Sequence, residues 1–125
     1  MTTDHLAAAL RACAAGLLPL EAGVTLLIAN GTFLHRDDFT SRFIEHSTSN
    51  SSHMAAIDWE AAITALDAGE LPSSAGEKRM LRLAASLADH VTVSLGEAVT
   101  GIDDRNFTLF IKAVLHAAGQ RQFPR

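Results

Sequence analysis

Apolar residues recur along the first part of the chain with the spacing of α-helices. In the first predicted helix, four apolar residues at i, i+3, i+4 and i+7 share one face: Leu6, Ala9, Leu10 and Cys13. Thr3 is a suitable N-cap for this helix, and Gly16 is a suitable stop. Pro19 is suited to the first turn of a second helix, which Gly31 ends.

A third helix is expected to begin at Asp37 or Asp38 and to bury Phe39, Phe43 and Ile44. The run "STSNSSH" at residues 47–53 then interrupts the pattern, because it contains no apolar side chain that a core could bury. We therefore predict that residues 47–53 form a flexible linker between two helical parts.

The second part of the chain carries several helix start signals. Asp58 can cap a helix that begins at Trp59, and "SAGE" at 74–77 has the spacing of a capping box, which "SLGE" at 94–97 repeats. Asp103 or Asp104 can cap the last helix, whose predicted inner face has nearly ideal helical periodicity. That face comprises Phe107, Phe110, Ile111, Val114, Leu115 and Ala118.

Two stretches of the chain resemble each other. "AAGLLPLEAG" at 14–23 matches "DAGELPSSAG" at 67–76, and the matched positions include a glycine, a leucine and a proline as well as alanines. The match places Gly23 opposite Gly76, and we interpret both glycines as points of close helix packing, with backbone access for a ligand as the alternative. The pattern predicts two copies of a helical hairpin.

These elements predict an all-α fold, namely a compact bundle of about six to seven helices in one domain over residues 1–125. The predicted pseudo-repeat halves span about 3–46 and 56–119, and the tail "RQFPR" is expected to be frayed.

Composition narrows the class of protein. A chain of 125 residues with 48% hydrophobic and 19% charged residues is typical of one globular domain, and it contains no apolar run long enough to span a membrane. Asp4 and Arg11 interrupt the N-terminal segment, so we expect no signal peptide and a cytoplasmic location. The net charge of −4 argues against nucleic-acid binding.

The densest cluster of chemically active side chains is "HRDDFTSRFIEH" at 35–46. His35, Asp37, Asp38 and His46 are candidate ligands for a divalent metal, since imidazole and carboxylate groups bind such ions. Their spacing matches no local metal-binding signature, and aspartates at a helix start also stabilise the helix dipole. We therefore expect the structural role, with neither a metal nor a cofactor.

Three further features have a structural interpretation beside the functional one. Cys13 is expected to be a small core residue rather than a nucleophile, and His116 is expected to stabilise the end of the last helix. Lys78, Arg79 and Arg82 are expected to form a solvated basic face rather than a phosphate or DNA site.

The stretch between residues 33 and 44 is unusually rich in large apolar side chains, which can mark an interface. We therefore predict a non-enzymatic interaction protein that forms homo-oligomers or binds another protein. The predicted interface residues are Phe33, Leu34, Phe39 and Phe43. The alternative is a small-molecule or metal-binding enzyme with a pocket between the two halves, where "HRDD" at 35–38 meets "GIDD" at 101–104.

The succession of "GLLPLEAG", "DWEAAITALDAGELPSSAGEKRMLRLAASLADHV" and "GIDDRNFTLFIKAVLHAAG" resembles short all-helical bacterial proteins of unassigned function. The resemblance implies a compact helical domain, and it brings no functional residues with it.

Overall fold

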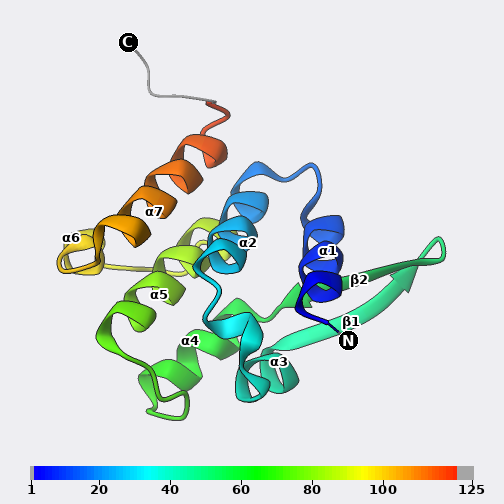
Figure 1. Ribbon diagram of the computed structural model, residues 1–125, viewed down its shortest axis with the longest axis horizontal. Coiled ribbons are helices and arrows are strands. Elements are labelled where there is room, and N and C mark those ends of the chain that lie inside the picture. The colour runs from blue at the N-terminus through cyan, green and yellow to red at the C-terminus, as the bar shows by residue number, and fades with distance from the viewer. Residues whose placement is uncertain (1, 121–125) are drawn as a thin grey trace.

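Seven α-helices, a 3₁₀ turn and a β-hairpin make up residues 2–120, which are the residues that the computed structural model describes (Figure 1). The order is α1 (Thr3–Ala14), α2 (Leu18–Asn30), η1 (Phe33–His35), α3 (Asp37–Phe43), β1 (Ile44–Ser49), β2 (Ser52–Ile57), α4 (Trp59–Asp67), α5 (Ala75–Asp89), α6 (Leu95–Val99) and α7 (Asp104–Ala117). The fold is 66% helical. The predominance of helices is therefore confirmed, while the tail "RQFPR" lies outside the described residues.

The β-hairpin corrects the prediction of a purely all-α fold with a flexible linker at 47–53. β1 and β2 are antiparallel, and their register runs from the pair Ile44 and Ile57 to the pair Ser49 and Ser52. Asn50 and Ser51 connect the strands with φ values of 50° and 65°, the left-handed conformation that two-residue hairpin turns require. The sequence concealed the strands because their outer halves are polar on both faces and show no alternation.

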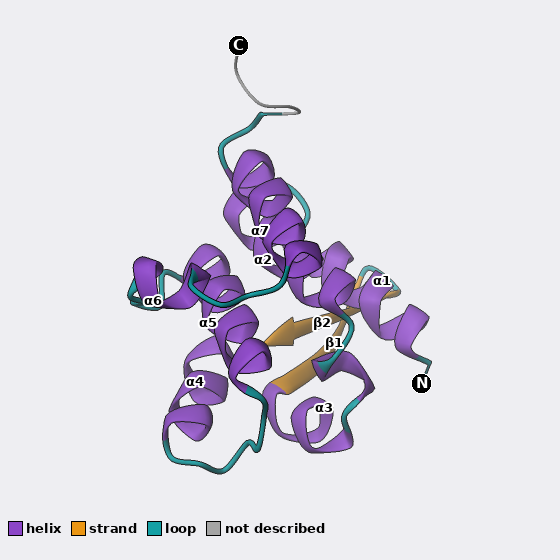
Figure 2. Cartoon of the chain, turned by 60° about the vertical axis from the view of Figure 1, so that its left-hand side comes forward, coloured by secondary structure: helices purple, strands orange, loops and turns teal. Residues whose placement is uncertain are grey.

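The hairpin is held at its base and projects at its tip. Ile44, Ala55 and Ile57 are buried, and α1 packs against β2. The strands pass between α1 and α3 (Figure 2). Their tip then extends past the helices (Figure 1).

Most of the predicted helix starts are confirmed. The Asp58 carboxylate accepts a hydrogen bond from Ala61 N at 3.1 Å, and that of Asp103 accepts one from Asn106 N at 2.7 Å. Ser74 and Glu77 form both bonds of the predicted capping box. Two details differ, because Thr2 rather than Thr3 caps α1 and the Ser94 side chain makes no capping bond to α6.

The buried face of α1 contains three of its four predicted residues, Leu6, Ala9 and Leu10. Ala14 is buried and Cys13 is exposed, so the prediction that Cys13 is a core residue is wrong. Cys13 instead lines a crevice of about 260 Å³, together with Leu10, Val24 and Trp59. The buried residues of α1 face both α2 and β2, since α1 packs against both elements.

The structure does not show the predicted duplication of a helical hairpin. α2 packs against both α5 and α7, and a Cβ added at Gly23 would lie 2.6 Å from the Ala84 carbonyl oxygen and 2.6 Å from the Ala88 Cβ. A Cβ added at Gly76 would meet no atom within 4 Å. Close helix packing therefore explains only the first of these two glycines.

Candidate functional site

The four residues predicted to form an interface lie in the core of the protein. Phe33 and Phe39 are 0% exposed, and Leu34 and Phe43 are 4% exposed. The Phe39 ring packs between the other two phenylalanine rings, with centroid distances of 5.2 Å to Phe33 and 5.5 Å to Phe43. The apolar surplus between residues 33 and 44 is therefore buried within the chain, which leaves these side chains inaccessible to a partner.

Three of the four candidate metal ligands line one polar cavity of about 270 Å³. His35, Asp37 and His46 share this cavity with Thr3, whose hydroxyl lies 3.3 Å from Nδ1 of His35. The cavity contains no residue of the stretch 101–104, so "HRDD" and "GIDD" do not meet there. The arrangement can hold a small polar molecule through hydroxyl, imidazole and carboxylate groups.

His46 also faces His53 across the hairpin. Nδ1 of His46 lies 2.9 Å from Nε2 of His53, and the rings are nearly parallel at an angle of 13°. Two imidazoles can occupy two positions around a transition metal. Within residues 2–120, however, no group of three or more His, Cys, Asp or Glu side chains is placed to hold a metal ion.

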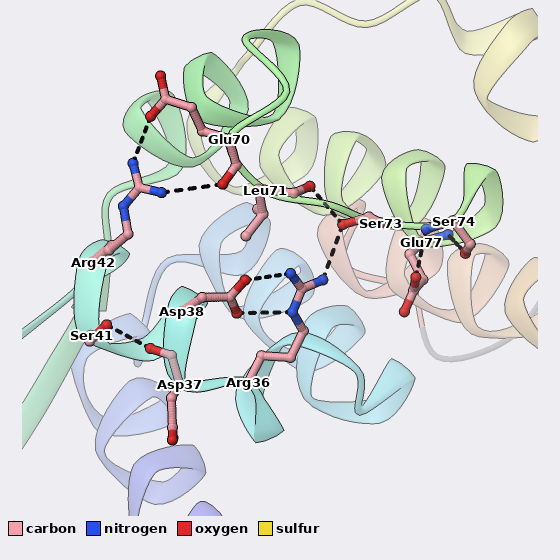
Figure 3. A network of polar contacts seen from close by, with 10 residues as sticks. All are labelled: Arg36, Asp37, Asp38, Ser41, Arg42, Glu70, Leu71, Ser73, Ser74 and Glu77. Atoms are coloured by element: carbon pink, nitrogen blue, oxygen red, sulfur yellow. Dashed lines mark hydrogen bonds and ion pairs between the residues drawn. The ribbon is translucent and has the colours of Figure 1, made fainter.

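Asp38, the fourth candidate ligand, does not line this cavity, and its carboxylate is bound to Arg36 (Figure 3). Nε of Arg36 donates to Asp38 at 3.0 Å, and Nη1 of Arg36 donates to the Ser73 hydroxyl at 3.1 Å. Arg42 forms a second link, since it donates to the Glu70 carboxylate at 2.9 Å. The two arginines thus connect α3 and the residue before it to the segment between α4 and α5, which gives much of "HRDDFTSR" a structural role.

This network makes the stability of the fold depend on pH. The Arg36 guanidinium lowers the pKa of Asp38 below its ordinary 3.8, and the backbone N–H of Ser74 lowers that of Glu77 below its ordinary 4.5. A carboxyl with a lowered folded-state pKa stabilises the fold above its unfolded-state pKa, and this contribution is lost as the pH falls through the folded value. We therefore expect the urea concentration at the unfolding midpoint to decrease as the pH is lowered from about 5 to about 3.

Glu77→Gln is the matched variant for this prediction. Glutamine can still form the capping box but cannot titrate. The variant should therefore lose less stability than the wild type when the pH falls from 6 to 3. Equal losses in the two proteins would show that Glu77 contributes nothing to the effect.

Polar contacts along the α2–α7 seam are also structural. Asn30 donates to the Asn106 side chain at 2.9 Å, and Arg105 donates to the Ala29 carbonyl at 2.8 Å. At the other end, Nε2 of His116 lies 2.8 Å from the Glu21 carboxylate. The Gly16 backbone N–H and then His116 lower the pKa of Glu21. His116 thus joins α7 to α2.

One edge of α7 carries exposed apolar side chains from the face whose periodicity the sequence analysis identified. Phe110 and Ala113 are buried, whereas Phe107 is 45% exposed and Val114 is 39% exposed. Ile111 lies between the last two along the helix and is half-buried. We call Phe107, Ile111 and Val114 the α7 stripe. Its helical periodicity was visible in the sequence, but the direction in which it points was not.

The predicted basic face of α5 forms one wall of a groove of about 520 Å³. Segment 92–98, which leads into α6 and includes most of it, forms the opposite wall. We call this cavity the basic groove. Its lining comprises Ala75, Lys78, Arg79, Arg82, Thr92, Val93, Ser94, Glu97 and Ala98.

The chain matches no protein-family model, no curated protein and no solved structure. No helix within residues 2–120 has the length and apolar character needed to cross a membrane.

Proposed function

We propose that this protein is a non-enzymatic interaction protein and that it self-associates through the α7 stripe. The exposure of Phe107 and Val114 on one helix face carries the proposal. Exposed apolar side chains that are grouped on one face gain free energy when a partner removes them from water. The stripe thus takes over the role that the sequence analysis gave to the phenylalanines of η1 and α3.

A second copy of the chain fits the α7 stripe because the stripe is complementary to itself. If two α7 helices pack antiparallel around a two-fold axis at Ile111, Phe107 of one copy meets Val114 of the other. Between Arg105 and His116 the only charged residue is Lys112. Lys112 lies about 100° around the helix from Ile111, so the two lysines are not forced together.

The proposed interface is small. α7 has 14 residues and is therefore about 21 Å long. An interface centred on one such helix lies near or below the ~1,200 Å² at which weak, transient complexes are found. We therefore expect a dimer in reversible exchange with the monomer.

Light scattering over a range of protein concentrations tests the proposal. The wild type should shift from monomer to dimer as the concentration rises to about 1 mM, and Phe107→Ser combined with Val114→Ser should remain monomeric. Leu95→Ser is the control, because Leu95 is 56% exposed but lies on α6. A monomeric wild type, or a double variant that dimerises like the wild type, contradicts the proposal.

The alternative, an enzyme with a pocket between the two halves, has less support. The cavity that contains His35 and Asp37 takes no residue from 101–104, and Asp103 is engaged in capping α7. No observation favours catalysis over interaction.

A further inference from the structure

The basic groove has the size of a site for a small molecule. Its volume of about 520 Å³ falls within the range of roughly 300–1,000 Å³ that is typical of ligand pockets. Its walls belong to elements that contact each other directly, since α6 packs against α5. The groove is therefore a pocket with two sides rather than a flat helix surface.

The groove carries more positive than negative charge, in a protein whose net charge is −4. Lys78, Arg79 and Arg82 face a single carboxylate, that of Glu97. Arg82 is neutralised by Asp67, with a distance of 2.6 Å between Nη2 and Oδ1. Within residues 2–120, the side chains of Lys78 and Arg79 form no ion pair.

Arg79 is half-buried, and it has no counter-ion among the described residues. A partly desolvated cation without a counter-ion is unfavourable, and a bound anion offsets that cost. Nη1 of Arg79 lies 3.3 Å from the position that a Cβ on Gly101 would take. A side chain at position 101 would crowd the guanidinium, and Gly101 leaves room for it.

The groove also offers groups that recognise more than a charge. A guanidinium presents paired N–H donors that match the oxygens of a phosphate, and the hydroxyls of Thr92 and Ser94 provide further donors. The Glu97 carboxylate only accepts hydrogen bonds, so it can bind hydroxyl groups of a ligand but repels a second phosphate.

From this arrangement we infer that the basic groove binds a small phosphate monoester of a polyhydroxy compound, with the phosphate at Lys78 and Arg79 and the hydroxyl groups at Glu97. The capping box does not contribute, because Glu77 already occupies the start of α5. Single-stranded nucleic acid is a poorer fit, since no aromatic side chain lines the groove for base stacking. This site is separate from the α7 stripe, and either assignment can fail without the other.

Isothermal titration calorimetry at low salt tests the inference with glucose 6-phosphate, inorganic phosphate and glucose. Glucose 6-phosphate should bind more tightly than inorganic phosphate, and glucose should not bind. Arg79→Gln should weaken both phosphate ligands by about tenfold or more, and Lys78→Gln should weaken them to a smaller degree. Arg11→Gln, which removes an exposed arginine of α1, should leave both affinities unchanged.

Glu97→Gln provides the sharpest arm of the experiment. The change removes a negative charge that repels anions, so inorganic phosphate should bind more tightly. It also removes the carboxylate that accepts hydrogen bonds from the sugar hydroxyls, so the difference in affinity between glucose 6-phosphate and inorganic phosphate should become smaller. Circular dichroism confirms that each variant is folded, and the exposed Lys78 supplies a second variant if Arg79→Gln does not fold.

Several results would overturn the inference. The first is that glucose 6-phosphate does not bind at 10 mM ligand, which is roughly the weakest affinity of interest. The second is that neither Arg79→Gln nor Lys78→Gln weakens binding. The third is that Arg11→Gln weakens binding as much as these two variants do. Arg79-dependent binding of a single-stranded oligonucleotide more tightly than glucose 6-phosphate would assign the groove to nucleic acid instead.

Discussion

Phe39→Ala should lower the free energy of unfolding by about 3–5 kcal/mol, the range for removing a fully buried aromatic side chain. Phe39 is 0% exposed, and its ring lies between those of Phe33 and Phe43. The truncation removes both ring contacts and leaves a cavity that the surrounding helices can fill only in part. Urea denaturation followed by circular dichroism measures the loss.

Phe107→Ala is the matched control for this experiment, because the same residue type is 45% exposed at position 107. Measured at a concentration where the protein is monomeric, it should cost less than about 1 kcal/mol. If the two variants lost similar amounts of stability, Phe39 would not occupy the core position that the structure assigns to it.

Gly23→Ala should lower the free energy of unfolding by about 2–3 kcal/mol, since it overpacks the contact between α2 and α5. The added methyl group would lie 2.6 Å from both the carbonyl oxygen of Ala84 and the Cβ of Ala88. Because one of these atoms belongs to the backbone, the clash is relieved only if the two helices move apart. The urea midpoint and the thermal midpoint should both fall.

Gly76→Ala is the control for Gly23→Ala and should act in the opposite direction. Gly76 lies in the first turn of α5, and an added Cβ would meet no atom within 4 Å. Replacing glycine by alanine in an unhindered helical position stabilises it by roughly 0.5–1 kcal/mol. Equal effects of the two substitutions would contradict the different packing of the two glycines.

The helix starts could be predicted because they depend on residues close together in the chain. The capping bonds of Asp58, Ser74 and Asp103 each span three residues, so a short stretch of sequence contains both the acceptor and the donor. The same locality explains the correct placement of Pro19 in the first turn of α2. Ser94 shows the limit of such patterns, since its spacing is favourable and its bond is absent.

The hairpin was missed because strand pairing depends on a partner rather than on local pattern. "STSNSSH" has the composition of a linker, and only the pairing of β1 with β2 turns it into a strand end, a turn and a strand start. The residue type at position 50 was a local sign of the turn, since asparagine tolerates positive φ better than most residues. Asn50 does adopt the left-handed conformation there.

The candidate sites depended even more on tertiary packing. Periodicity identified the apolar residues of η1, α3 and α7, but it did not show which of them a partner could reach: Phe39, Phe43 and Phe110 are buried, whereas Phe107 and Val114 are exposed. The basic face of α5 was predicted from Lys78, Arg79 and Arg82, whereas the wall opposite it comes from a segment more than ten residues away.

Local sequence therefore decides where the helices of this protein begin and which of their residues are apolar, because capping bonds and helical periodicity act within one or two turns. Tertiary packing decides which apolar face is buried, which glycine is crowded and which cations share a groove. Those outcomes depend on how α2, α5, α7 and the hairpin contact their neighbours. Each such contact joins residues that are far apart in the chain, so no single segment contains both partners of the interaction.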